Sequence, residues 1–151
     1  MKKALVLAVG LAALLAVVAA GCGGGGGGGT LTKEEYASKL NAICEEYNAK
    51  QEEIGEPQSL ADIGELGPKI VDAFDSAIDK AKDLNPPDEI ADQASRFISL
   101  GEQQRDLLND LIDAAKDNDT AKVQEIGSKI EPLSTESDQV ANELGAPACA
   151  E

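Results

Sequence analysis

Apolar side chains recur every three or four positions in four successive stretches after Thr30. This spacing places them on one face of an α-helix, whereas a strand would alternate apolar and polar residues. No stretch shows sustained alternation flanked by hairpin turns, and aromatic residues are few. The pattern predicts four helices, over residues 33–54, about 60–84, about 88–117 and about 120–144.

The residues at the predicted helix ends support these limits. Thr32 and Glu35 fit a capping box, in which each side chain accepts a hydrogen bond from the other residue's backbone. Asp119 fits an N-cap for the fourth helix. Glycine or proline follows three of the helices, at Gly55, Asn85-Pro86-Pro87 and Gly145-Ala146-Pro147.

Two prolines fall inside predicted helices, Pro68 directly after Gly67 and Pro132 in the fourth helix. Because proline lacks a backbone donor and crowds the preceding turn, we expect a kink at each, with a break and restart as the alternative at Gly67-Pro68. Short links make neighbouring helices antiparallel. Residues 30–151 are therefore predicted to form an all-α domain, an up-and-down four-helix bundle with kinked second and fourth helices.

The first 21 residues have the pattern of an export signal. Lys2 and Lys3 precede the run from Ala4 to Ala20, which is entirely apolar or glycine. Small residues then lead into Cys22, an arrangement typical of bacterial lipoproteins, which are cut before this cysteine and lipidated on it. We predict a signal peptide over 1–21, lipid on Cys22, and a cysteine-glycine linker over 22–29.

Two other interpretations of this segment remain open. An ordinary secretory signal can be cut after Val18-Ala19-Ala20, which leaves Cys22 without a clear purpose. A transmembrane helix needs about 17–25 apolar residues, a length that the run only just reaches. In the preferred reading the lipid contacts the membrane, and the domain faces outward or into the periplasm. The glycines Gly23–Gly29 form a flexible tether with a span of roughly 15 Å.

The chain is strongly acidic, with 13 basic and 28 acidic residues. Removal of Lys2 and Lys3 with the signal leaves 11 basic against 28 acidic residues, a net charge of −17. Such a charge disfavours nucleic acid and anionic lipid as partners and suits a basic protein or another envelope component. Acidic stripes on the second and third predicted helices are expected to face water and to point away from each other; they comprise Glu65, Asp72, Asp79 and Asp83, and Glu102, Asp106, Asp110, Asp113 and Asp117.

Two cysteines remain after lipidation of Cys22. Cys44 lies beside the apolar face of the first predicted helix, and Cys149 lies in the tail after the last helix stop. An exported chain meets an oxidising environment, so a disulfide between them is predicted. The geometry requires that the fourth helix stop short of the start of the first, or that the tail fold back along a groove. Two free thiols, or a buried Cys44, are the alternatives.

Three short motifs carry a resemblance to other proteins. They are Asn41-Ala42-Ile43-Cys44, Leu84-Asn85-Pro86-Pro87, and Leu144-Gly145 followed by Cys149. In these features the domain resembles uncharacterised small exported proteins and lipoproteins of actinobacteria. The resemblance implies a fold and a location but no activity.

Residues that usually carry chemistry are missing from the sequence. The chain has no histidine, which removes the commonest general base and metal ligand. Met1 is the only methionine, and the cysteines are too few and too far apart for zinc. We therefore predict a non-catalytic protein with no metal site and no cofactor.

Two polar residues interrupt the apolar faces, Gln104 in the third predicted helix and Ser137 in the fourth. If buried, each needs a hydrogen-bond partner, and they either bond across the bundle or line a small ligand pocket. Two functions follow from the sequence. The first is a lipid-anchored interaction or structural module of the cell envelope, which expects a tightly filled core. The alternative is a small-ligand-binding lipoprotein, which expects a cavity touching Gln104 and Ser137.

Overall fold

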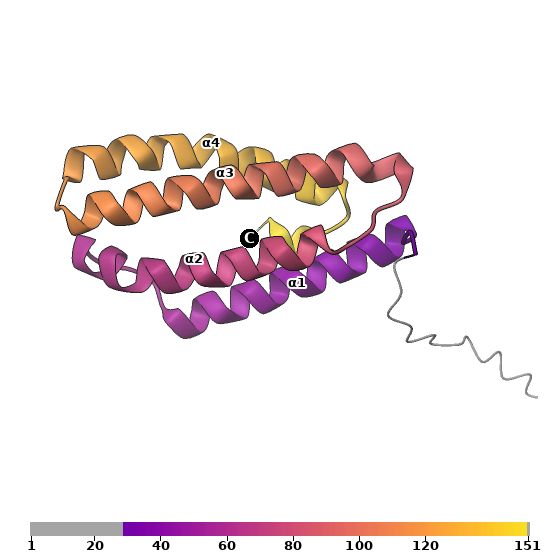
Figure 1. Cartoon of the computed structure of the whole chain (residues 1–151), viewed down its shortest axis with the longest axis horizontal. Helices are drawn as coiled ribbons and strands as arrows, with labels where there is room; N and C mark the ends of the chain where they lie inside the picture. The colour runs from indigo at the N-terminus through magenta and orange to yellow at the C-terminus, as the bar shows by residue number, and fades with distance from the viewer. Residues whose placement is uncertain (1–28, 151) are drawn as a thin grey trace, which may run out of the picture.

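The structure, a computed structural model, describes residues 29–150. Its helices are α1 (Lys33–Ile54), α2 (Leu60–Lys82), α3 (Ala91–Lys116) and α4 (Thr120–Glu143), with single 3-10 turns η1 (Asp88–Ile90) and η2 (Pro147–Cys149). These residues contain no β-strand, and consecutive long helices run in opposite directions (Figure 1). The prediction of an all-helical domain with four helices is confirmed. The predicted signal peptide, Cys22 and all of the linker except Gly29 lie outside the described residues.

Side-chain caps fix the starts of three helices. The Thr32 hydroxyl accepts from the Glu35 backbone N–H at 3.2 Å, and the Glu35 carboxylate accepts from the Thr32 N–H at 2.9 Å, which confirms the capping box. Asp119 caps α4 by accepting from the Lys122 N–H at 3.0 Å, as predicted. Ser59 accepts from the backbone of α2 in the same way.

The connection between α2 and α3 differs from the prediction. Helix α2 ends at Lys82, before Leu84, and the predicted third helix begins as η1 and becomes α-helical only at Ala91. Pro86 and Pro87 account for this difference. A residue that precedes proline is driven towards extended backbone, and Pro87 itself is extended, with ψ 154°.

Neither internal proline ends its helix. Helix α2 continues through Pro68, so the alternative of a break and restart is wrong, and α4 continues through Pro132. Gly67 is buried against α3, where an added Cβ would lie 2.5 Å from Cγ1 of Ile112. The Gly67-Pro68 pair therefore allows α2 and α3 to approach closely, while the expected kinks remain predictions.

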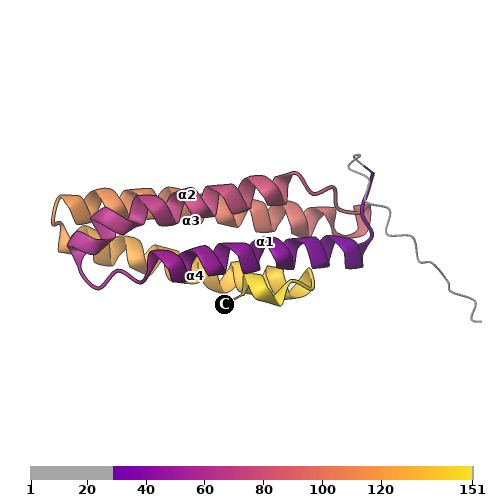
Figure 2. The same cartoon turned by 90° about the horizontal axis from the view of Figure 1, so that it is seen from below.

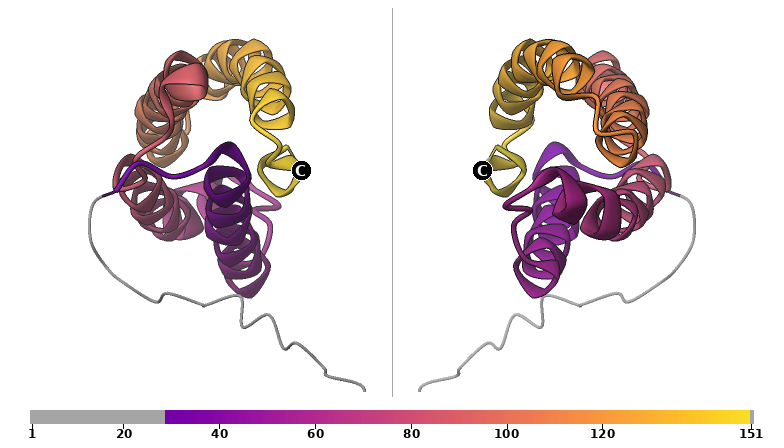
Figure 3. Two further views of the ribbon diagram at one scale, coloured as in Figure 1. Left: turned by 90° about the vertical axis from the view of Figure 1, so that its right-hand side faces the viewer. Right: turned by 90° about the vertical axis from the view of Figure 1, so that its left-hand side faces the viewer.

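The four helices form an incomplete ring. Helix α1 packs against α2, α2 against α3 and α3 against α4, but within residues 29–150 α1 and α4 hardly touch. Instead η2 contacts both and lies beside them in the lengthwise and end-on views (Figures 2 and 3). The main core fills the end where α1 begins and α4 ends; its most deeply buried side chains are Tyr36, Leu40, Val140 and Leu144.

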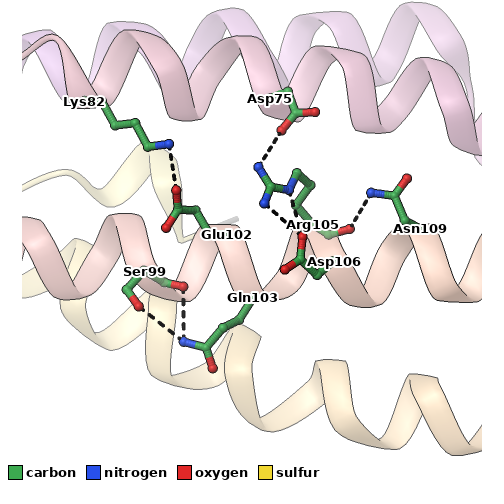
Figure 4. A network of polar contacts seen from close by, with 8 residues as sticks. All are labelled: Asp75, Lys82, Ser99, Glu102, Gln103, Arg105, Asp106 and Asn109. Carbon is green, nitrogen blue, oxygen red and sulfur yellow. Dashed lines mark hydrogen bonds and ion pairs between the residues drawn. The ribbon is translucent and has the colours of Figure 1, made fainter.

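Ion pairs connect α2 and α3 along their shared edge (Figure 4). Lys82 contacts Glu102 at 2.6 Å, and Arg105 bridges Asp75 at 3.3 Å and Asp106 at 2.9 Å. The hydrogen bond to Glu102 raises the pKa of Lys82. The expectation that both acidic stripes point away from each other is wrong for Glu102, because this side chain reaches the basic residue on α2.

Candidate functional site

A cavity of about 300 Å³, partly open to solvent, lies within the incomplete ring. All four helices contribute to its wall, and Cys149 adds the C-terminal tail. The backbones of α1 and α4 do not run close together along their length, although side chains of both meet in the core at one end. The cavity lies between side chains of all four helices. Its volume is at the lower end of the range for ligand pockets, about 300–1,000 Å³.

The wall supplied by α2 and α3 is apolar. Phe74 of α2 lies against Tyr47 of α1, with ring centroids 5.3 Å apart and planes tilted by 43°. On α3, Gly101 widens the space, because a Cβ there would make only ordinary contact with Ile78 at 3.5 Å. Other apolar side chains of α2 and α3 complete this wall, among them Ile70, Ala77, Phe97 and Leu108, and Ile43 adds to it from α1.

A group of polar side chains lines the cavity where α3 faces α4. The Gln104 amide donates to the Ser134 hydroxyl at 3.2 Å, and both residues line the cavity. Ser137 lines it as well and is 7% exposed. The structure thus brings Gln104 and Ser137 to one site. Gln104 bonds across the bundle, which was one of the two alternatives, and its partner is Ser134, three residues before Ser137.

Tyr47, Asn48 and Gln51 line the cavity from α1. The Gln51 amide donates to the Tyr47 hydroxyl at 2.6 Å. Burial raises the pKa of Tyr47 to about 12, so the phenol is neutral at physiological pH. This side of the site offers neutral hydrogen-bonding groups rather than a charge.

Cys44 and Cys149 form a disulfide, with Cα atoms 5.1 Å apart, which confirms the predicted pair. Both cysteines line the cavity. Of the two routes expected for the tail, the chain takes the second and folds back along α1. Gly145, with φ +76°, makes the reversal, and its backbone lies close to Ala37.

Two asparagines of α1 hold the returning tail. Asn41 donates to the Gly145 carbonyl and accepts from the Ala148 N–H, both at 3.0 Å. Asn48 donates to the Ala148 carbonyl, also at 3.0 Å. The tail therefore covers part of the gap between α1 and α4 through backbone hydrogen bonds in addition to the disulfide.

The cavity lining carries one negative charge and no positive charge. Asp138 of α4 is the only charged residue in its lining, which contains no lysine or arginine. The ion pairs among the described residues use other carboxylates, so no described basic side chain neutralises Asp138. The site combines an apolar wall, neutral hydrogen-bonding groups and one carboxylate.

The described residues contain no group of three or more His, Cys, Asp or Glu placed to hold a metal ion. Within residues 29–150, none of the helices has the length and apolar character needed to cross a bilayer. Cys22, the predicted lipid site, lies outside this part of the chain.

Several residues of the site were missed by the sequence analysis. Asn41 and Asn48 lie three positions before and four positions after Cys44, so they share a helix face with the predicted disulfide residue, and this spacing could have indicated a common task. Ser134 and Ser137 share a face by the same rule. Asp138 gave no such signal, because one more acidic residue in an acidic chain is ordinary.

Comparisons with known proteins found no match for this chain: no protein family, curated protein or solved structure is similar to it.

Proposed function

We propose that this protein is a lipid-anchored, extracytoplasmic binding protein whose helical bundle holds a small, largely apolar ligand. The observation that carries the proposal is the cavity of about 300 Å³ that touches Gln104 and Ser137. Of the two functions that the sequence allows, the interaction or structural module expects a filled core, and the binding protein expects this cavity. The lining gives no arrangement of nucleophile and base, so the proposed role is non-catalytic.

The location follows from features outside and inside the bundle. The apolar run that ends in Cys22 supports lipid attachment after removal of residues 1–21. The disulfide supports export, because such bonds persist in oxidising compartments. Helix α1 begins at Lys33, close to the proposed glycine tether, so such a tether would hold the bundle near the membrane.

The size of the cavity indicates the size of its ligand. An engineered apolar cavity of about 150 Å³ binds benzene. A cavity of twice this volume accommodates an aromatic ring with a short chain, or an aliphatic molecule of similar bulk. Affinity comes mainly from burial of apolar surface, at about 25 cal/mol per Å² before the cost of association.

A cavity-filling substitution tests the proposal. The chain from Gly23 onward is exported through an unlipidated signal, because the core, the caps and the disulfide all lie between Leu31 and Cys149. It is titrated with the neutral fluorescent probe N-phenyl-1-naphthylamine. We expect saturable binding of one probe per chain, weakened about tenfold or more by Ala77→Leu, which places an isobutyl group in the cavity wall.

The matched control is Ala61→Leu, the same change at an exposed position of the same helix. This variant should bind the probe as the unaltered chain does. Thermal unfolding is measured for each variant, and Gly101→Ala, which adds one methyl group to the cavity, replaces Ala77→Leu if that variant does not fold. Absence of saturable binding, or equal weakening by Ala61→Leu and Ala77→Leu, would contradict the proposal.

A further inference from the structure

We propose that the ligand carries a protonated amine, and that Asp138 pairs with this amine while the rest of the molecule occupies the apolar cavity. This inference rests on the proposed function and adds the chemical class of the ligand. It is drawn from the charges in the cavity lining, which differ from those of a site for a fatty acid or another anion.

The lining argues against an anionic ligand. A carboxylate or phosphate head group is usually paired with lysine, arginine or a helix N-terminus. The cavity lining contains no basic side chain, and its one charged group is the Asp138 carboxylate. An anion there would meet a like charge inside a chain whose net charge is already −15, so its binding is disfavoured.

The same features favour a cation. Asp138 is partly buried and has no ion pair with a described basic residue. An alkyl amine is protonated at neutral pH, as the lysine side chain is, and a charge-assisted hydrogen bond to a carboxylate is among the stronger polar contacts. A bound amine would supply the partner that Asp138 lacks.

Neighbouring groups can complete the coordination of the amine. Ser134 and Asp138 are four positions apart on α4 and line the cavity together with Ser137. Residues at this spacing lie on one helix face. An ammonium group has three donors, so a carboxylate and hydroxyl oxygens on that face can accept them.

The aromatic side chains suit the remainder of such a ligand. Tyr47 and Phe74 lie in contact with each other and line the cavity, and Phe97 lines it from α3. An aromatic or aliphatic body joined to an amine by a short chain would pack on these rings while its charged end reaches α4. We therefore assign the site to small amphipathic amines rather than to apolar molecules in general.

Three ligands with the same apolar body test the assignment, namely 4-phenylbutylamine, 4-phenylbutanol and 5-phenylpentanoate. Each displaces N-phenyl-1-naphthylamine from the same exported chain at low ionic strength. We expect the amine to bind about tenfold more tightly than the alcohol, as a charged hydrogen bond provides, and the carboxylate to bind most weakly.

The variant Asp138→Asn separates this inference from the proposed function. It should remove the preference for the amine and leave the affinity for the alcohol within about twofold of that of the unaltered chain. The matched control, Asp110→Asn, removes one negative charge as well, at an exposed position of α3 outside the cavity lining, and should keep the preference.

The outcomes distinguish the two proposals. If the alcohol binds, and Ala77→Leu weakens its binding, but the chain binds the amine no more tightly than the alcohol, then the cavity binds ligands and the amine assignment is wrong. If Asp110→Asn reduces the preference as much as Asp138→Asn, the overall charge explains it and the assignment is also wrong. If no ligand displaces the probe and sedimentation shows a dimer, the second copy occupies the gap and both proposals fail.

Discussion

Removal of the disulfide between Cys44 and Cys149 should cost several kcal/mol of stability. The bridge closes a loop with a sequence separation of 105 residues. In the chain-entropy description, a cross-link over such a loop stabilises the folded state by about 4.7 kcal/mol, because it restricts the unfolded chain. The double variant Cys44→Ala/Cys149→Ala leaves no free thiol between residues 29 and 150 and should lose about 4–5 kcal/mol.

Urea unfolding followed by circular dichroism measures this loss. For a domain of this size the free energy of unfolding falls by about 1.5 kcal/mol per M urea, so the urea concentration at the midpoint of unfolding should fall by about 3 M. The slope of this dependence on urea should itself become steeper, since an unfolded chain without the bridge exposes more surface. The double variant must still show a helical spectrum in the absence of urea for the comparison to hold.

A second variant separates the bridge from the contacts of the tail. Asn41→Ala removes the hydrogen bonds to Gly145 and Ala148 and keeps the disulfide. It should cost about 1–3 kcal/mol, because backbone groups of the tail lose their partner, and should leave the slope unchanged. A loss below about 1 kcal/mol for the cysteine variant, with no change of slope, would refute the loop-closure reasoning.

Three further predictions concern other parts of the chain. Tyr36 is fully buried, burial raises its pKa, and its hydroxyl has no hydrogen-bond partner among the described residues. Tyr36→Phe should therefore leave the free energy of unfolding unchanged or raise it by up to about 1 kcal/mol. A decrease of more than about 1 kcal/mol in urea unfolding would contradict this and indicate a hidden partner. Gly67→Ala should lower the melting temperature, because the added Cβ would collide with Ile112. Gly127→Ala has open space around the added Cβ and should raise the melting temperature, since alanine favours a helix by about 1 kcal/mol over glycine. Equal effects of the two variants would contradict the close approach of α2 and α3. Cys22→Ser should abolish lipid labelling of the full chain. If intact-mass spectrometry of the unaltered protein showed no acyl group on Cys22, the lipid anchor would be wrong.

The sequence predicts the helices well because their signals are local. Thr32, Glu35 and Asp119 act on backbone groups within a turn, so their caps can be read without knowledge of the rest of the fold. The prediction for the end of α2 is less accurate, because Pro86 and Pro87, four and five residues beyond Lys82, decide how the chain leaves the helix. The disulfide could be predicted from the expected export of the chain and the number of its cysteines.

The cavity could not be predicted in the same way. Its existence depends on α1 and α4 standing apart, and helical periodicity gives the inward face of each helix but not the distance between two helices. For the same reason the partner that Gln104 finds across the bundle, Ser134, could not be predicted, since Ser134 and Ser137 both lie on the inward face. The contribution of Asp138 became visible only with the full lining, because the absence of basic residues is a property of the whole site.

The position of the disulfide also determines how the molecule responds to mechanical force. A pull between the two ends of the described chain enters at the start of α1, crosses from Cys44 to Cys149 through the covalent bridge, and leaves at Ala150. Only residues 29–43 can then be drawn out, a length of about 50 Å at the extended rise of the backbone. Helices α2, α3 and α4 lie inside the covalent loop and bear no tension. A bundle held by its N-terminus would therefore yield over the first turns of α1, while most of the cavity wall stays outside the loaded path.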